Sequence, residues 1–259
     1  MPSYSEIAQP FKSGRAAEVP DSWKQGRTAY GGLTSALCIE AARLDLPDLP
    51  PLRSLQMNFT GPVTGDPEFE ATLLRQGRNV TSVAVEARVE GGAVGNALAL
   101  FGADRDSVLD IDLSAPSVVS PEMAEEFMPE GTPFVPNFIP NFELKIAGGA
   151  RPMTGAEEGH LLAWVRHRDP EDHDGETAFV CLGDVLPPAA FPVMTSPVPI
   201  SSANWTLNLL REPTTRDGWF LIESRQSAAR AGYSSQVMRF WNTDGQMVAE
   251  GMQCVAVFG

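Results

Sequence analysis

The stretch GGLTSALCIEAARLDLPDLPPLRSLQMNF, residues 31–59, decides the fold because it joins an apolar helix to a half-buried strand. Apolar residues recur at helical spacing from Leu33 to Leu44, and Pro47 stops the run. Apolar and polar residues then alternate from Leu55 to Phe59, which is the period of a strand with one buried face. The helix is apolar around most of its circumference, so we expect a sheet to wrap around it.

Further alternating runs follow this first strand. They cover residues 69–74, 83–89 and 97–101, and Gly91-Gly92 supplies a hairpin turn before the last of them. The first half of the sequence therefore predicts one helix followed by antiparallel strands.

The second half repeats this order at an offset of roughly 150 residues. A less regular helix is predicted over residues 178–186. Strands are predicted at 142–145, 160–168, 205–209, 219–222, 236–241 and 247–258, with Asp244-Gly245 as a hairpin turn. An internal duplication is the simplest explanation. We divide the chain into a first unit at 1–105, a proline-punctuated linker at 106–133 with one short helix near 122–128, and a second unit at 134–259.

The charge balance excludes whole classes of function. The 259 residues include 33 acidic and 19 basic side chains, for a net charge of −14. A general binder of nucleic acid or of anionic membranes carries the opposite balance, so neither partner is expected. The N-terminal residues lack a basic segment followed by an apolar one, and no apolar run is long enough to span a membrane. These features predict a cytoplasmic protein.

Short motifs along both halves resemble the acyl-CoA thioesterase II-like family, and the resemblance covers about Trp23 to Phe258. They are Gly31-Gly32-Leu33, Leu52 to Phe59, Gly61-Pro62, Arg75 to Asn79, Leu182-Gly183-Asp184, Pro187-Pro188, Ser202 to Thr206, Asp244-Gly245, Val248-Ala249 and Gln253. The resemblance implies an α+β double hotdog fold, in which each of two fused units wraps an antiparallel sheet around a central helix. It also implies hydrolysis of fatty acyl-CoA to free acid and CoA without a cofactor or a metal.

By this resemblance, three side chains of the second half hold a water that attacks the thioester carbonyl: Asp184, Ser202 and Gln253. A carboxylate in a dry cleft suits a general base, because desolvation raises its pKa towards neutral pH. Asp184 stands in a mostly apolar stretch, where such desolvation is expected. Thr206 is the reserve hydroxyl, because an even separation along a strand places it on the face of Ser202.

The substrate is expected to bind across both halves. The N–H groups at the start of the first helix suit a developing oxyanion, and glycines there allow close approach of the ligand. Guanidinium groups suit the phosphates of CoA. The predicted substrate-binding residues are Gly31, Gly32, Asn58, Arg75, Arg78, Asn79 and Arg230. By analogy with hotdog proteins, we expect a homodimer or a higher homo-oligomer.

Several alternatives stay open at the level of sequence. The chain could bind acyl-CoA or another apolar ligand without hydrolysing it, and Asp184 could simply cap a helix. A hotdog hydratase or dehydratase is disfavoured, because it needs a histidine near the first helix and every histidine lies between residues 160 and 173. The cluster His167, Asp169, Glu171, Asp172, His173 and Asp174 resembles a metal site, but we favour a solvated acidic loop.

Overall fold

The computed structural model describes residues 1–14 and 17–259. The helices are α1 (Tyr4–Gly14), α2 (Gly31–Asp45) and α3 (Glu176–Gly183), with short 3-10 turns at Asp21–Trp23, Ile139–Asn141, Pro170–Asp172 and Phe191–Val193. The strands of the first half are β1 (Lys24–Gln25), β2 (Thr28–Ala29), β3 (Leu52–Phe59), β4 (Glu68–Gln76), β5 (Val80–Val89) and β6 (Gly92–Gly102). Those of the second half are β7 (Glu125–Glu126), β8 (Phe142–Gly149), β9 (His160–His167), β10 (Ile200–Leu209), β11 (Phe220–Arg230), β12 (Tyr233–Asn242) and β13 (Met247–Val257).

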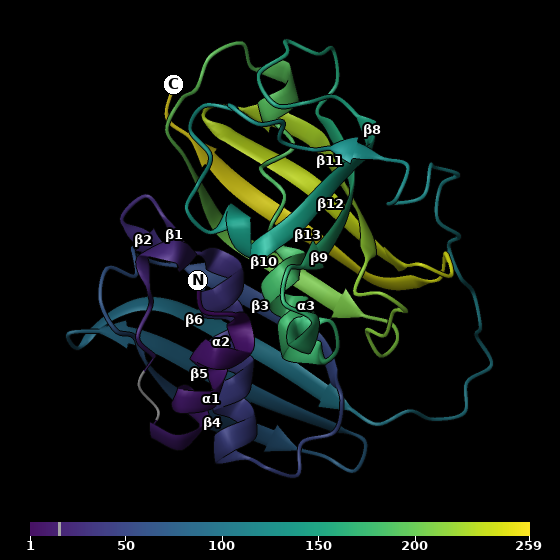
Figure 1. The fold of residues 1–259 in the computed structure, drawn as a ribbon. Coiled ribbons are helices and arrows are strands. Elements are labelled where there is room, and N and C mark those ends of the chain that lie inside the picture. The colour runs from purple at the N-terminus through teal and green to yellow at the C-terminus, as the bar shows by residue number, and fades with distance from the viewer. Residues whose placement is uncertain (15–16) are drawn as a thin grey trace.

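One antiparallel sheet runs through both halves of the molecule. Its eleven described strands follow the order β4-β5-β6-β3-β10-β13-β12-β11-β9-β8-β7. The two halves meet where β3 pairs with β10, and Figure 1 shows the first half below and the second half above this junction. Gln56 pairs with Thr206 at this junction, so the two residues that face each other are also 150 apart in sequence. The predicted duplication is therefore an approximate twofold symmetry centred on this pair.

The sheet wraps around α2, as the sequence predicted. Every residue from Gly32 to Ala42 is buried, so the helix has no solvent face. It packs against α3, whose residues from Ala178 onward are also buried, and against α1. Side chains such as Leu55 and Trp205 point from the sheet into this shared core. The result is an α+β double hotdog fold.

The linker between the halves differs from the prediction at one point. The expected helix near 122–128 is wrong, because Glu125 and Glu126 form the short edge strand β7 against β8. The backbone N–H of Phe127 donates to the carbonyl of Leu144, 3.0 Å away, and holds the segment extended. Pairing with an open sheet edge has prevailed over local helix propensity here.

The linker also covers the outer face of the second half, which is the face turned away from α2 and α3. The indole N–H groups of Trp164 and Trp241 donate to the carbonyls of Val119 and Leu113, at 2.8 and 2.7 Å. These tryptophans belong to a second, smaller apolar cluster that is separate from the main core. Figure 1 shows the teal linker leaving the first half and passing along the second.

The proposed solvated acidic loop is wrong for its buried members. Asp172 is buried, and its carboxylate accepts from the backbone N–H groups of Tyr4 and Ser5 at 2.8 and 2.9 Å, so it caps the start of α1. His167 is buried too. Its ring lies 2.8 Å from the carbonyl of Ala178, and burial lowers its pKa to about 4. Among the described residues, no group of three or more potential ligands could hold a metal ion.

Candidate active site

Three predicted catalytic side chains lie together at one end of the second unit. Gln253 of β13 donates from Nε2 to Asp184 Oδ1 at 2.8 Å and to Ser202 Oγ at 2.9 Å. Asp184 directly follows the last residue of α3, and Ser202 belongs to β10, which pairs with β13. The sequence places these residues up to 69 positions apart, and the helix end and two neighbouring strands bring them into contact.

The surroundings of Asp184 favour a carboxyl group that titrates near neutral pH. Burial raises its pKa to about 7, and the hydrogen bond from Gln253 opposes part of that rise. The neighbouring titratable groups are Tyr30 and Cys181, and burial raises the pKa of each well above its usual value. Both neighbours are therefore neutral at pH 7, so Asp184 is the group here that can exchange a proton with a substrate.

The start of α2 approaches Asp184 from the other half of the molecule. A Cβ at Gly31 would lie 2.5 Å from Asp184 Oδ2, and a Cβ at Gly32 would collide with the carbonyl oxygen of Cys181. Only glycine allows these approaches. The first N–H groups of a helix have no acceptor within the helix, and they carry partial positive charge. A carboxylate from one half thus faces hydrogen-bond donors from the other.

Tyr30, which the sequence reasoning overlooked, joins the two helix ends. Its hydroxyl donates to the carbonyl of Cys181 in α3 at 2.8 Å, while its backbone caps α2. Its ring stacks on Phe138 with centroids 4.1 Å apart. A buried tyrosine requires a partner for its hydroxyl, and that requirement ties the start of α2 to the end of α3. The only sequence signal was an aromatic residue next to a glycine pair.

Thr206 does not belong to this cluster, so its predicted place beside Ser202 is wrong. A β-bulge between Ser202 and Asn204 inserts one residue and reverses the alternation of faces. Trp205 then points into the core, and Thr206 points to the outer face, where its hydroxyl contacts the backbone of Met252 at 3.2 and 3.4 Å. The parity argument failed because a bulge leaves no mark on a simple hydrophobic pattern.

Gln236, on the inner face of β12, continues the hydrogen-bond chain beyond Gln253. Its Nε2 donates to Gln253 Oε1 at 2.8 Å, and its Oε1 accepts from the backbone N–H of Ala189 at 2.7 Å. Both glutamines are buried. The sequence reasoning placed Gln236 in a strand without assigning it a role, although a polar side chain at an inward position of an apolar strand needs a buried partner.

Gly31 and Gly32 lie beside Asp184, but the other first-half residues predicted to bind substrate do not reach this cluster. Asn58 lies on the outer face and donates to Asn96 at 3.0 Å. Arg75 lies in the edge strand β4, and five strand spacings separate β4 from β13, about 24 Å along the sheet. Arg78 and Asn79 follow β4 in the turn to β5, so they lie at the same distant edge.

Arg230 is better placed than those residues. It ends β11 at the hairpin with β12, and the register runs from this hairpin through Ser234 and Val255 to Ser202. Three strand spacings, about 14 Å, separate β11 from β10. Arg230 therefore lies at the same end of the sheet as Asp184, Ser202 and Gln253.

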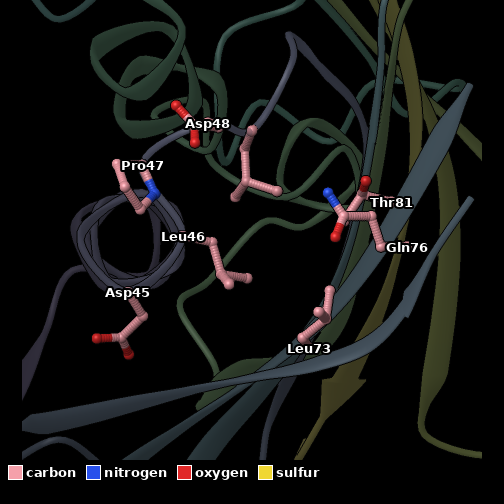
Figure 2. A pocket seen from close by; sticks show the side chains of 8 residues that line it. Asp45, Leu46, Pro47, Asp48, Leu73, Gln76 and Thr81 are labelled. Carbon is pink, nitrogen blue, oxygen red and sulfur yellow. The ribbon is translucent and has the colours of Figure 1, made fainter. Parts of the chain in front are cut away.

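The far end of α2 has two open pockets, and neither contains Asp184. Figure 2 shows the first, a cavity of about 200 Å³ beside Asp45 and Leu46, with Leu73 and Gln76 of β4 opposite. The second, about 330 Å³, is lined by residues that include Arg43, Leu52, Glu176 and Arg211. With 15 residues, α2 is about 22 Å long, so both pockets lie far from Gly31.

A second carboxylate, Glu40, occupies the twofold-related place at that end. The hydroxyl of Thr177, near the start of α3, donates to Glu40 at 2.8 Å, much as Asp184 lies beside the start of α2. Glu40 also accepts from the hydroxyl of Tyr4 at 3.1 Å and pairs with Lys12 at 3.3 Å, both from α1. Helix α1 thus covers the site around Glu40, and the Glu40 carboxylate binds side chains of α1.

Comparison with known proteins agrees with this architecture. The family model for the acyl-CoA thioesterase N-terminal domain matches residues 19–102, and the one for the C-terminal domain matches residues 118–257. A comparison with curated proteins found no match. The fold and the cluster at the junction define a double hotdog protein with a buried carboxylate. The chain belongs to the acyl-CoA thioesterase family.

Solved structures share the fold over nearly the whole chain. A hotdog-fold protein of unknown function from Alicyclobacillus acidocaldarius has a TM-score of 0.85 and 22% identity, and the match covers 95% of this chain and 94% of that one. An acyl-CoA thioesterase II from Mycobacterium marinum has a TM-score of 0.72 and 17% identity, with 94% and 92% covered. A TesB protein from Mycobacterium avium subspecies paratuberculosis has a TM-score of 0.75 and 14% identity, with the same coverage.

Proposed function

We propose that the protein hydrolyses fatty acyl-CoA to a free acid and CoA by attack of water on the thioester. The observation that supports this best is the position of Asp184. Its carboxylate is held by Gln253 at 2.8 Å, has a pKa raised to about 7 by burial, and faces the start of α2. Membership in the acyl-CoA thioesterase family supports the choice of substrate.

Each group has a distinct part in this proposal. Asp184 takes a proton from water as the water oxygen bonds to the thioester carbonyl carbon, and Ser202 helps to hold that water. The carbonyl oxygen becomes negative, and the N–H groups at Gly31 and Gly32 stabilise it. The tetrahedral intermediate then breaks its carbon–sulfur bond, and Asp184 returns the proton to the departing thiolate. Gln253 orients the base and the hydroxyl.

The phosphates of CoA need cations near this end of the sheet. Arg43, Arg53 and Arg211 each pair with a carboxylate, whereas Arg27 and Arg230 have no carboxylate partner in the part of the chain that the structure describes. Arg27 lies in the β1–β2 turn, only four residues, or about 14 Å of extended chain, before α2. We therefore assign phosphate contacts to Arg27 and Arg230.

A thiol-release assay on the purified protein tests the proposal directly. Short, medium and long acyl-CoAs are supplied, and free CoA is measured with a thiol-reactive dye. The proposal expects release with at least one chain length, and at least a hundredfold loss in the Asp184→Asn variant, the lower end of general-base contributions of roughly 10²–10⁴. Binding of acyl-CoA by calorimetry without release at any chain length would instead identify a non-catalytic acyl-CoA-binding protein.

Two further parts of the proposal concern organisation. The division into units at 1–105 and 134–259 with a linker at 106–133 predicts that limited proteolysis cuts first within the linker. A homodimer or higher homo-oligomer is expected, and light scattering of the purified chain measures its mass. No described helix is long and apolar enough to cross a bilayer.

A further inference from the structure

We propose that Gln236 is a positioning residue that fixes the amide orientation of Gln253, and thereby turns an N–H rather than a carbonyl towards Asp184. This inference rests on the proposed function for its catalytic meaning, although the orientation itself is a property of the free protein. Gln236 does not touch Asp184 or Ser202; it acts through Gln253 alone.

The orientation follows from a donor that cannot be reversed. A backbone N–H can only donate, so the N–H of Ala189 requires Gln236 to present its Oε1, at 2.7 Å. The Nε2 of Gln236 must then face Gln253, where it meets Oε1 at 2.8 Å. Gln253 has only its Nε2 left for the other side, and this atom donates to Asp184. The orientation of the Gln236 amide therefore fixes the orientation of the Gln253 amide.

The chain of bonds closes on itself. Ala189 lies five residues after Asp184, in the segment that follows α3. The ring therefore runs from the Asp184 carboxylate through Gln253 and Gln236 to a backbone group of the same segment. Gln236 is 1% exposed and Gln253 is 3% exposed, so bulk solvent does not reach either amide. A reversed Gln253 would place a carbonyl oxygen against a carboxylate and leave its own N–H facing another N–H.

Reversal would be visible in the titration of Asp184. The hydrogen bond from Gln253 lowers the pKa of this carboxyl, so its loss raises the pKa further. The other titratable groups near Asp184 are Tyr30 from the start of α2 and Cys181 from α3, and burial raises the pKa of both well above neutral. They stay neutral across pH 5 to 8, and any change in that range reports Asp184.

The variant Gln236→Met tests the inference. Methionine has nearly the same length, and its sulfur accepts weakly from Ala189, but it has no N–H to offer. The carboxyl carbon of Asp184 is followed by ¹³C NMR against pH in the free protein. We expect the Asp184 midpoint to rise in Gln236→Met, to rise in Gln253→Met, and to rise no further in the double variant, because both changes break one chain. Gln226→Met, on the neighbouring strand, serves as the matched control and leaves the midpoint in place.

Kinetics provide the second measurement. The midpoint of the profile of kcat/KM against pH moves with the pKa of Asp184. If that pKa rises by one unit, kcat/KM at pH values below the midpoint falls about tenfold, while KM changes little. An unchanged Asp184 midpoint in Gln236→Met, or additive shifts in the double variant, would overturn the inference. If the wild type hydrolyses no acyl-CoA, the proposed function fails, but the NMR titration still decides the role of Gln236.

If Gln236→Met does not fold, an NMR titration of the wild-type protein tests the amide orientation of Gln253 instead. The side-chain ¹⁵Nε2 resonance of Gln253 must shift with the Asp184 carboxyl at one shared midpoint, because this nitrogen donates to the titrating group. A Gln253 nitrogen that is insensitive to that titration would overturn the inference without any variant.

Discussion

Replacing Asp184 with asparagine should make the protein more stable and nearly inactive. Burial raises the pKa of this carboxyl from 3.8 to about 7, so the folded protein favours the protonated, uncharged form. Because the folded pKa lies above the unfolded one, the stability that Asp184 contributes is fully present below pH 3.8 and is lost as pH rises through about 7. Three pH units at about 1.4 kcal/mol each come to at most about 4 kcal/mol at pH 8.

The Asp184→Asn variant avoids the free energy of burying an ionised carboxylate above pH 7. Asparagine keeps an oxygen that accepts from Gln253, and it carries no charge at any pH. We expect its free energy of unfolding to exceed that of the wild type by up to about 4 kcal/mol at pH 8 and to match it near pH 4. For a chain of this size, Tm should rise by several degrees at pH 8. The same substitution should lower kcat by a factor of roughly 10²–10⁴ if Asp184 is the general base.

Calorimetric or fluorescence melting at pH 4 and pH 8, together with the thiol-release assay, measures both effects. Asp172→Asn is the matched control, because Asp172 is another buried carboxyl with a raised pKa, but it caps α1 and lies outside the cluster of Asp184, Ser202 and Gln253. Its activity should stay within twofold of the wild type. A stability difference for Asp184→Asn that does not depend on pH would refute the reasoning, as would full activity.

Three further outcomes follow from the site. The kcat/KM of the wild type should rise with pH through a midpoint near 7, because Asp184 acts as a base only when ionised; a flat profile between pH 5 and 8 would contradict this. Gly31→Ala should abolish turnover while circular dichroism stays unchanged, since its Cβ would lie 2.5 Å from the carboxylate, whereas Gly92→Ala in a surface hairpin should be silent. Arg230→Gln should raise KM for acyl-CoA and weaken its salt dependence, and Arg75→Gln should do neither; the reverse result would favour the distant edge of the sheet as the phosphate site.

Periodicity predicted a helix wrapped by antiparallel strands, because a helix without a polar face must be covered on all sides. The resemblance to the acyl-CoA thioesterase II-like family then implied the double hotdog fold. The candidate residues were found through the order of short motifs that resemble the family, and the structure brings Asp184, Ser202 and Gln253 within hydrogen-bond distance. Their catalytic roles stay predictions until they are measured.

The failures have physical causes that a one-dimensional pattern cannot contain. Thr206 was misplaced because a bulge changed the parity of β10, and Arg75 because its distance from the site depends on strand order. Asp172 was taken for a solvated residue because the helix that it caps lies more than 150 residues earlier in the chain. Gln236 was passed over because its partners come from a different strand and a loop.

The contacts of Tyr4 and Lys12 with Glu40 have a consequence for the number of ligands that each chain binds. A dimer of identical hotdog units would offer two equivalent reaction centres, one at each helix start. Here Glu40 pairs with Lys12 and accepts from the hydroxyl of Tyr4, so the proposed function predicts one reaction centre per chain, at Asp184. An inert analogue of the tetrahedral intermediate should therefore saturate at one molecule per chain, however many chains assemble.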